Sequence, residues 1–292
     1  MTPADKPVLK RMQEMTRPFE VQHWPHSGSR DLPNHLFQWE GFAPPPEDGA
    51  EPYSLQWFLA IEYERHIRHA RWIPHLFEFG RHRGETLVGL GNSLGTDWLQ
   101  YARHGARVIA CSPIAAELAL IRRNFELRGL NGRFVHTEPT RLPLAAASAD
   151  VVCINGLLHE AAEPVAVVEE VYRILKPGGK VVAVAPAKYG IDFYRTWFPW
   201  SKAMSGWLRG SPWRSAEADA AGAVQYFSRR RLKKLFHQFG NHRVHQRQLR
   251  RREAPWVLRV LPRKLLERWL GRFLILKAFK PVTAATPRRA AA

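Results

Sequence analysis

Cysteine is nearly absent from this sequence, which has only Cys111 and Cys153 among its 292 residues. Two cysteines cannot provide the disulfide framework of a small secreted domain, and these two form no paired metal-binding motif. We therefore expect a reducing compartment, the cytoplasm, and we predict no metal site.

Long apolar runs are also missing. No stretch reaches the roughly 18 apolar residues that a membrane-spanning helix needs. The first residues, MTPADKPVLKRMQEM, lack the apolar core of a signal peptide. The sequence therefore predicts no transmembrane segment and leaves a peripheral contact with a membrane surface open.

Acidic residues are scarce in one part of the chain. Residues 188–292 contain 24 Lys and Arg against 5 Asp and Glu, a net charge of +19, whereas residues 1–187 contain 20 against 21, a net charge of −1. Such a field attracts anionic partners, for example phospholipid surfaces, phosphorylated substrates or nucleic acid. The alternative is an arginine-rich surface that is simply solvated.

What the sequence does contain, between about residues 80 and 188, is an alternation of short apolar runs and amphipathic segments. Near-continuous apolar strands separated by helices predict a parallel sheet that helices cover on both faces. Ligands of such sheets lie at the carboxyl ends of the strands. The expected strands are 86–90, 106–111, 132–136, 150–154 and 180–185, the expected helices are 96–103, 114–128 and 164–175, and KPGG at 176–179 is an expected turn.

The first expected strand runs into a loop of small residues, within the stretch GETLVGLGNSLGTD from Gly84 to Asp97. Glycines in such a loop let the polar atoms of a ligand approach the backbone closely. The G-x-S-x-G spacing from Gly91 to Gly95 is looser than a dinucleotide fingerprint, and no lysine follows as a phosphate-binding loop requires. The loop is therefore a candidate nucleotide site with an incomplete signature.

Residues 1–79 form an expected N-terminal extension. Residues 1–52 are rich in Pro, His and Trp, which predicts irregular structure. From Ser54 to about Phe79 the sequence predicts helix that Pro74 interrupts or restarts, packed on the core as a lid or flank. Its apolar residues recur close to a period of 3.6, at Leu55, Phe58, Leu59, Tyr63, Ile67 and Ala70.

The chain after residue 188 divides into two expected parts. Residues 189–227 are an aromatic insertion that either faces a substrate or forms an ordinary aromatic subcore. Residues 228–292 are expected to form basic helices and the closing strands of the same domain. Ser228 is the predicted N-cap of a helix with one apolar and one basic face, and residues 255–270 are a second basic amphipathic stretch.

Taken in order, these runs resemble class I S-adenosylmethionine-dependent methyltransferases of the methyltransferase type 11 group. The resemblance covers roughly residues 72–188 and rests on the glycine loop, LP after the third strand, LLH after the fourth and LKPGG before the fifth. It implies an α/β, Rossmann-like sheet that is mostly parallel with an antiparallel last strand and is flanked by helices. The 1–79 extension and the insertion after strand five would be additions to this core of residues 80–188, and the implied cofactor is S-adenosylmethionine.

The resemblance also implies which residues hold that cofactor. In the family, the loop after strand one passes under the methionine part, the end of strand two meets the ribose, and the end of strand three meets the adenine. The matching cofactor-binding positions are Gly89, Gly91, Ser93, Gly95, Ser112, Pro113, Glu138, Pro139 and Asn155.

Two acidic residues that the family usually has are missing, because Gly89 and Ser112 occupy their places. Asp97 either substitutes for the first or is only a first-turn residue favoured by the helix dipole. Two hypotheses follow. The chain is either an active methyltransferase for a hydrophobic or anionic, small-molecule or lipid-like substrate, or a catalytically degenerate relative that serves as a scaffold or binding module.

The remaining candidates concern the substrate and partners. His159 is the candidate catalytic base, since an imidazole changes charge near neutral pH, and the alternative is that it caps or packs the following helix. Tyr189, Tyr194 and Trp197 are candidate substrate contacts. Residues 228–280 are a candidate contact with an anionic membrane surface, and nucleic acid fits less well because no recognised binding module is present.

Overall fold

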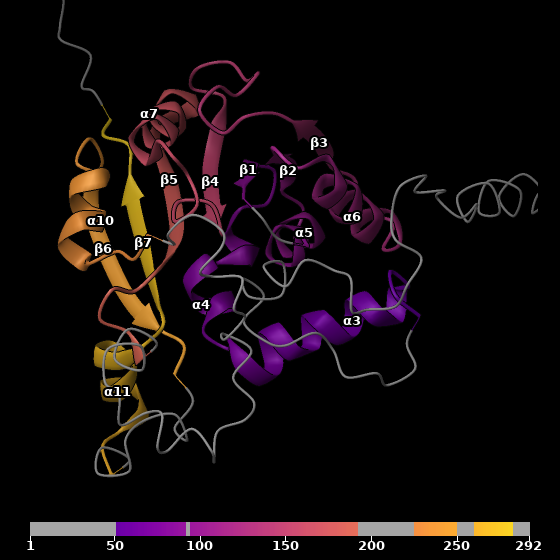
Figure 1. Ribbon diagram of the computed structural model, residues 1–292. Helices are drawn as coiled ribbons and strands as arrows, with labels where there is room; N and C mark the ends of the chain where they lie inside the picture. Colours follow the sequence, from indigo (N-terminus) through magenta and orange to yellow (C-terminus); the bar gives the residue numbers. More distant parts are fainter. Residues whose placement is uncertain (1–50, 92–93, 192–224, 250–259, 283–292) are drawn as a thin grey trace, which may run out of the picture. The chain divides into compact units, whose positions relative to one another are not determined.

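The computed structural model describes residues 51–91, 94–191, 225–249 and 260–282. At its centre lies a seven-stranded sheet with the strand order β3-β2-β1-β4-β5-β7-β6 (Figure 1). The strands are β1 (Thr86–Leu90), β2 (Arg107–Ser112), β3 (Arg133–His136), β4 (Ala149–Asn155), β5 (Leu175–Pro186), β6 (Gly240–Arg247) and β7 (Phe273–Phe279).

The strand directions make this sheet mostly parallel. β1 pairs in parallel with β2 and β4, β2 with β3, and β4 with β5, whereas β7 runs antiparallel to both of its neighbours, β5 and β6. The predicted Rossmann-like α/β sheet with an antiparallel last strand is therefore confirmed. Each of the five strands expected between residues 80 and 188 is present.

One expected strand boundary is wrong. β5 begins at Leu175 instead of Lys180, because Leu175 pairs with Ala149 of β4 before the pairing resumes at Lys180 opposite Val151. The KPGG residues between these two pairs leave the ladder as a bulge, and Gly178 has a φ of 79° there. Glycine adopts this left-handed conformation without the strain that a β-carbon causes. The expected turn therefore lies inside the strand.

Helices cover both faces of the sheet, as the apolar strands predicted (Figure 1). Alternate residues of a strand point to opposite faces. Val152 of β4 belongs to the apolar cluster on the face of α7 and α10, and its neighbour Val151 belongs to the cluster on the face of α5 and α6. These helices and the last one are α5 (Thr96–Arg103), α6 (Ala115–Glu126), α7 (Pro164–Ile174), α10 (Arg229–Leu235) and α11 (Arg263–Leu270).

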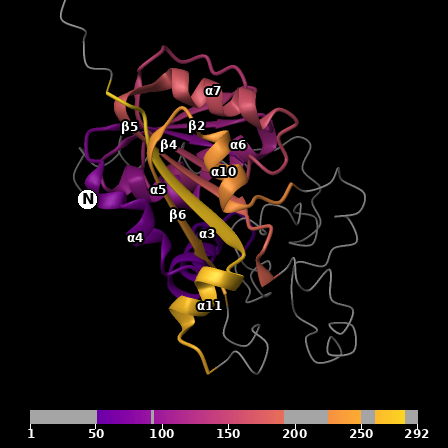
Figure 2. The same ribbon diagram turned by 90° about the vertical axis from the view of Figure 1, so that its left-hand side faces the viewer.

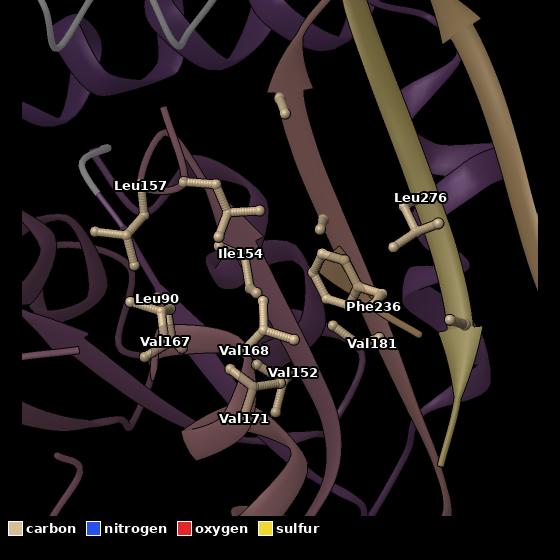
Figure 3. Packing of buried hydrophobic residues seen from close by; sticks show 14 of the residues in the cluster. Leu90, Val152, Ile154, Leu157, Val167, Val168, Val171, Val181, Phe236 and Leu276 are labelled. Atoms are coloured by element: carbon tan, nitrogen blue, oxygen red, sulfur yellow. The ribbon is translucent and has the colours of Figure 1, made fainter. Parts of the chain in front are cut away.

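The face covered by α7 and α10 shows how the core is packed (Figure 3). Val168 and Val171 of α7 lie against Val152 of β4, and Phe236, just after α10, lies beside Val181 of β5. All five side chains are buried. Full burial of an apolar side chain of this size contributes about 1.5 to 3 kcal/mol, which is why these helices stay fixed on the sheet.

The N-terminal flank is helical but irregular. Pro74 lies in the first turn of α4, so it restarts the helix, as one of the two predicted alternatives had it. Between α3 and α4 the chain forms a π-helix, in which the N–H of Ala70 donates to the carbonyl of Arg65 at 2.7 Å. The elements are α3 (Leu55–Tyr63), the π-helix η1 (Glu64–His69), α4 (Ile73–Phe77) and the 3₁₀-helix η2 (Phe79–Arg81).

The expected inner face of this flank is wrong in part. Leu59, Tyr63 and Ile67, which the period placed on the core side, are 44%, 55% and 48% exposed. The buried face continues instead into Arg65 and His66, which are 4% and 7% exposed. Leu59 and Tyr63 lie in α3, whose buried side is formed by Trp57, Phe58 and Ile61. Ile67 lies in η1, and a π-helix has more residues per turn than an α-helix, so it changes which side chains point inward.

The C-terminal elements follow the prediction where the structure describes them. Ser228 caps α10, since its Oγ accepts a hydrogen bond from the N–H of Arg231 at 3.1 Å. Leu232 is buried, whereas Lys233 and Lys234 are exposed, which confirms the two faces of this helix. Of the stretch 255–270, residues 260–270 are described and include α11, which lies beyond the end of β6 (Figure 2). None of the described helices is long and apolar enough to cross a membrane.

Candidate functional site

The candidate site lies where β1 and β4 end. Gly91, the first residue after β1, has a φ of 132°, and a β-carbon there would lie 1.7 Å from the carbonyl oxygen of Asn155. Only glycine lets these two backbone segments come so close. Gly95, with a φ of 72°, would place a β-carbon 2.6 Å from Cγ2 of Ile121. The backbone angles and close neighbours of Gly91 and Gly95 therefore require glycine at both positions, and Ser93 lies outside the described residues.

The missing acid at Gly89 has a steric cause. A β-carbon on Gly89 would lie 2.4 Å from Cδ2 of Trp98, whose indole is fully buried in α5. β-Carbons essentially never come within 3.0 Å of a heavy atom outside their own and the neighbouring residues. A carboxylate at position 89 is therefore incompatible with Trp98, and Gly89 contributes backbone only.

Asp97, in the first turn of α5, is the centre of a buried polar cluster. Arg65 of η1 binds it through two hydrogen bonds, Nε to Oδ1 at 2.8 Å and Nη2 to Oδ2 at 2.5 Å. His66 Nε2 lies 2.9 Å from Oδ1, and Nδ2 of Asn155 donates to Oδ2 at 3.2 Å. A bidentate pair of this kind is among the stronger polar interactions in proteins. Asp97 is therefore more than a first-turn residue that the helix dipole favours.

The electrostatics of this cluster hold Asp97 ionised. Burial alone would raise the pKa of Asp97, but the charge and hydrogen bonds of Arg65, with a further contribution from His66, place it well below its usual range. Removing one partner of a buried pair is costly because the other charge is left uncompensated. The cluster is therefore a fixed negative charge with a fixed positive charge beside it.

Asn155, the last residue of β4, adds an acceptor to this cluster. Its side chain is 2% exposed, and its Oδ1 receives no hydrogen bond from any residue that the structure describes. A buried acceptor without a donor costs about 1 to 3 kcal/mol, so such atoms occur where a ligand or water supplies the donor. Asn155 lines a cavity of about 10 Å³ together with Arg65, Trp72 and Gln248. The indole Nε1 of Trp72 donates to Oε1 of Gln248 at 3.1 Å.

The end of β2, where the resemblance places the ribose, carries no carboxylate on the strand itself. Ser112 is fully buried, and its Oγ accepts a hydrogen bond from the N–H of Ile114 at 3.1 Å. The carboxylate of Glu117, in the first turn of α6, lies 3.4 Å from the same Oγ. Pro113 is half-buried, and its carbonyl accepts from Nε2 of His136 at 2.8 Å. Ser112 thus offers one hydroxyl, already hydrogen-bonded to the backbone.

The loop after β3 carries the candidate adenine contacts. Glu138 is exposed and Pro139 is half-buried. The carbonyl of Glu138 accepts from the N–H of Arg141 at 3.2 Å, which turns the chain there. Glu138 is therefore an exposed residue in a tight turn at the same edge of the sheet as Asn155.

His159 lies in the loop between β4 and α7 and is 5% exposed. Its Nε2 lies 3.0 Å from Oε1 of Glu160, and its carbonyl accepts from the N–H of Gln225 at 3.1 Å. α7 begins after Glu163 without a side-chain cap, so His159 does not cap it. The part of the alternative in which His159 caps the helix is therefore wrong, whereas the part in which it packs there agrees with its burial, and its role as a base stays a prediction.

Of the three candidate substrate contacts, only Tyr189 belongs to the residues that the structure describes. Tyr189 is 51% exposed, and Nζ of Lys188 lies 5.8 Å from its ring centroid. Tyr194 and Trp197 lie outside the described residues. Tyr189 alone therefore stands as an accessible aromatic side chain just after β5.

Sequence reasoning missed Arg65 and His66 as site residues. The signal was present in ERHIRHAR at residues 64–71, where three arginines and two histidines interrupt an apolar helical pattern. Charged side chains are rarely buried unless they are paired, so this run pointed to a buried acidic partner. Nothing in the sequence alone identified that partner as Asp97.

A larger cavity lies elsewhere. It measures about 530 Å³ and is lined by Glu78, His82, Asp150 and Lys180, among others. Asp150 lies near the amino end of β4, and Lys180 of β5 pairs with the next residue of β4, Val151, so this cavity is at the opposite edge from Asn155. It is therefore separate from the candidate site. Within the described ranges, no group of three or more His, Cys, Asp or Glu side chains could hold a metal ion.

The chain is similar to methyltransferases over its core. Residues 87–183 match the family model of a methyltransferase domain, type 11. A demethylmenaquinone methyltransferase from Clavibacter sepedonicus is 36% identical over 100 residues, which cover 34% of this chain and 40% of that protein. One of the same name from Beutenbergia cavernae is 31% identical over 135 residues, 43% of this chain and 55% of that protein. The chain thus spans about half, or less, of the length of the curated relatives it matches.

Solved structures agree in fold. A SAM-dependent methyltransferase from Aquifex aeolicus superimposes with a TM-score of 0.50 at 14% identity, over 78% of this chain and 98% of that one. A SAM-dependent methyltransferase from Methanosarcina mazei superimposes with a TM-score of 0.50 at 16% identity, over 72% of this chain and 98% of that one. The resemblance read from the sequence is confirmed: residues 87–183 match the methyltransferase-domain family model, and the fold is that of S-adenosylmethionine-dependent methyltransferases.

Proposed function

We propose that this chain, whose core is a class I S-adenosylmethionine-dependent methyltransferase domain, is an enzyme that transfers a methyl group from S-adenosylmethionine to a hydrophobic, lipid-like acceptor. The observation that carries the proposal is the unpartnered, buried Oδ1 of Asn155 beside the Arg65–Asp97 pair. An acceptor, an anion and a cation meet there at the carboxyl ends of β1 and β4. Ligands of open α/β sheets bind at this edge.

The residues present fit the cofactor. Asn155 and Asp97 are suited to its amino group, and the backbone at Gly91 and Gly95 leaves the loop without side-chain bulk. Ser112 and Pro113 would lie along the ribose, with Glu138 and Pro139 along the adenine. The cofactor, when bound, supplies an electrophilic sulfonium methyl group.

The protein then has to orient the acceptor and, for an O–H, N–H or C–H acceptor, to take up a proton. We assign the second task to His159, and its Nε2, 3.0 Å from Oε1 of Glu160, supports this proposal. Orientation alone can supply a large part of the rate enhancement, so few further groups are needed. Substitution of His159 by Gln is expected to lower kcat while leaving cofactor affinity unchanged.

A hydrophobic acceptor is favoured by two observations. Residues 189–213 contain many Trp, Tyr and Phe side chains, and Tyr189 is accessible at the end of β5. The two relatives are named for methylating demethylmenaquinone. We extend this to the present chain as a lipid-like acceptor class only.

Calorimetric titration with S-adenosylhomocysteine, the product form of the cofactor, tests the proposal. Micromolar binding is expected, and Glu138→Ala is expected to weaken it about tenfold, the effect of one lost charge-assisted hydrogen bond. Glu126→Ala, an exposed acid on α6, is the matched control and should leave affinity unchanged. Absence of heat and of any thermal shift at millimolar ligand would favour a catalytically degenerate scaffold instead.

A peripheral membrane contact through residues 228–280 is the second part of the proposal. Exposed cations follow one face of α10, and Trp269 of α11 is exposed. Cations near an anionic surface gain about 1 kcal/mol each, and Trp favours the interface. Lys233→Glu with Lys234→Glu is expected to abolish salt-sensitive co-sedimentation with anionic vesicles. Equal recovery of the unmodified chain with neutral vesicles would contradict this contact.

A further inference from the structure

We infer that the cavity beside Asp150 and Lys180 is a second ligand site, in which the amine of Lys180 forms an imine with a small aldehyde or ketone that carries an anionic group. The cavity lies at the edge of the sheet opposite the candidate cofactor site. Its volume of about 530 Å³ is within the range of roughly 300 to 1,000 Å³ that is usual for small-molecule sites. Methyl transfer at the other edge is not needed for this reaction.

Three side chains that line the cavity form a chain of hydrogen-bonding groups. Oε2 of Glu85 lies 2.6 Å from Nδ1 of His82, and Nε2 of His82 lies 2.7 Å from Nζ of Lys180. Because the carboxylate of Glu85 can only accept, Nδ1 carries a proton and Nε2 is the acceptor for Lys180. A nucleophile beside a base that a third group orients is the arrangement of nucleophilic catalysis. His82 is therefore the base for Lys180.

The charges around Lys180 allow its amine to become neutral. The carboxylate of Glu78 lies 2.9 Å from Nζ of Lys180 and 3.2 Å from Nζ of Lys277. When Lys180 passes a proton to His82, the imidazolium pairs with Glu85, and Glu78 keeps Lys277. Each carboxylate therefore retains a cation, so no buried charge is left uncompensated. Burial also lowers the pKa of Lys180, although Glu78 acts in the opposite direction.

Further cations that line the cavity favour a ligand with an anionic group. Arg243 of β6 is exposed and takes part in none of the ion pairs found among the described residues. Lys176 also lines the cavity, but its Nζ is held by Asp150 at 2.7 Å. A guanidinium group binds a phosphate or carboxylate through two parallel hydrogen bonds. Arg243 is therefore the residue that we assign to the anionic group.

Imine formation at this site requires proton transfer but no oxidation. His82 takes a proton from the ammonium group, and the lone pair of the Lys180 nitrogen attacks the carbonyl carbon. The C–N bond forms while the carbonyl π bond breaks, and the oxygen leaves as water with two protons that came from the nitrogen. The products are a protonated imine and one water molecule, so the positive charge beside Glu78 is retained. Burial lowers the pKa of His82, so its imidazolium readily returns the proton to the leaving oxygen.

The test labels the full chain with limiting pyridoxal 5′-phosphate, an aldehyde that carries a phosphate group. Borohydride then reduces each imine to a stable amine, and peptide mapping by mass spectrometry identifies the labelled lysines. Lys180 should be labelled at least about tenfold faster than Lys233 and Lys234, which are exposed on α10, since one pKa unit changes the fraction of free amine tenfold. Labelling of Lys180 no faster than that of these two residues overturns the inference.

Two variants test the base and the group that orients it. His82→Gln should slow the labelling of Lys180 about 100-fold, the lower end of what a positioned acid–base group contributes. Glu85→Gln should slow it to a smaller extent. His237→Gln, an exposed histidine after α10, is the matched control and should label like the unmodified chain. Unchanged labelling of Lys180 in a His82→Gln chain that still unfolds cooperatively in urea overturns the role of the base.

A third variant tests the anionic group and changes only an exposed side chain, so it serves even if His82→Gln does not fold. Arg243→Met should slow labelling of Lys180 by pyridoxal 5′-phosphate about tenfold, the effect of one lost charge-assisted hydrogen bond. Labelling by pyridoxal, which lacks the phosphate, should be slower in the unmodified chain and should not respond to Arg243→Met. Equal labelling of Lys180 by the two aldehydes in the unmodified chain overturns the anionic ligand class.

Discussion

The ammonium group of Lys180 lies 2.7 Å from Nε2 of His82, and the two side chains meet at the edge of the sheet opposite the candidate site. Nδ1 of His82 lies 2.6 Å from the carboxylate of Glu85, which can only accept, so Nδ1 carries the proton and Nε2 accepts from Lys180. Burial lowers the pKa of both His82 and Lys180. Glu78 binds Lys180 at 2.9 Å and Lys277 at 3.2 Å, which ties the N-terminal flank to β5 and β7.

This cluster predicts a loss of stability in acid. Burial would raise the pKa of Glu78, but Lys180 and Lys277 lower it to about 2, below its ordinary value of 4.5. A carboxylate with a lowered pKa stabilises the fold above its unfolded-state pKa, and this contribution disappears as the pH falls from about 4.5 toward 2. Urea unfolding should therefore show Glu78→Gln less stable at pH 7 by on the order of 1 to 3 kcal/mol.

The pH profile provides the control for that prediction. Glu78→Gln should lose less of its unfolding free energy than the unmodified chain between pH 5 and pH 2.5, because it has no carboxylate to protonate. Glu126→Gln, on the exposed side of α6, should follow the unmodified chain. Identical slopes for Glu78→Gln and the unmodified chain would contradict the role assigned to Glu78.

A second prediction concerns the contact between Gly89 and Trp98. Gly89→Ala should destabilise the chain by about 1 to 3 kcal/mol, the usual effect of overpacking a core, since the added methyl meets a buried indole. Gly80→Ala is the matched control, because its β-carbon meets nothing closer than His104 Cδ2 at 3.6 Å. In a chain that already carries Trp98→Leu, Gly89→Ala should lower the unfolding free energy less than it does in the unmodified chain, because the indole that the added methyl meets is gone.

The two cysteines provide a third prediction. Cys111 and Cys153 are both buried, and burial raises the pKa of Cys111 to about 12 and that of Cys153 well above its ordinary value. Because the thiolate is the reactive form, neither should react with a disulfide reagent such as DTNB until the chain unfolds. Ala116→Cys places a thiol on the exposed side of α6 and should react at once, as a positive control. If two thiols per native, unmodified chain reacted rapidly with DTNB, the buried packing of Cys111 and Cys153 would be contradicted.

A fourth prediction concerns the cap of α10. Ser228→Ala removes the hydrogen bond to the N–H of Arg231 and should lower the unfolding free energy by about 0.5 to 2 kcal/mol. Ser228→Asp should retain it, because aspartate also caps and its charge suits a helix N-terminus. If both variants lose the same amount, the hydroxyl of Ser228 matters for something other than capping.

Much of the fold could be predicted from local patterns. The apolar run at 86–90 and the segment 96–103 have the bounds of β1 and α5 as predicted, because their periodicity and bounding glycines act over a few residues. Ser228 was recognised as a cap for the same reason. The start of β5 depends instead on the pairing of Leu175 with Ala149 in a neighbouring strand. The turn that KPGG predicts locally therefore gave the wrong start for this strand.

The candidate site was predicted less completely. The sequence by itself determined the class of the sheet, the position of its ligand edge and the absence of acids at positions 89 and 112. Only the tertiary structure decided why Gly89 carries no side chain and what Asp97 binds. Trp98 lies over Gly89, and Arg65 reaches Asp97 from 32 residues away along the chain through a π-helical turn. Contacts between such distant residues depend on how the elements pack, and neither periodicity nor motif spacing records that packing.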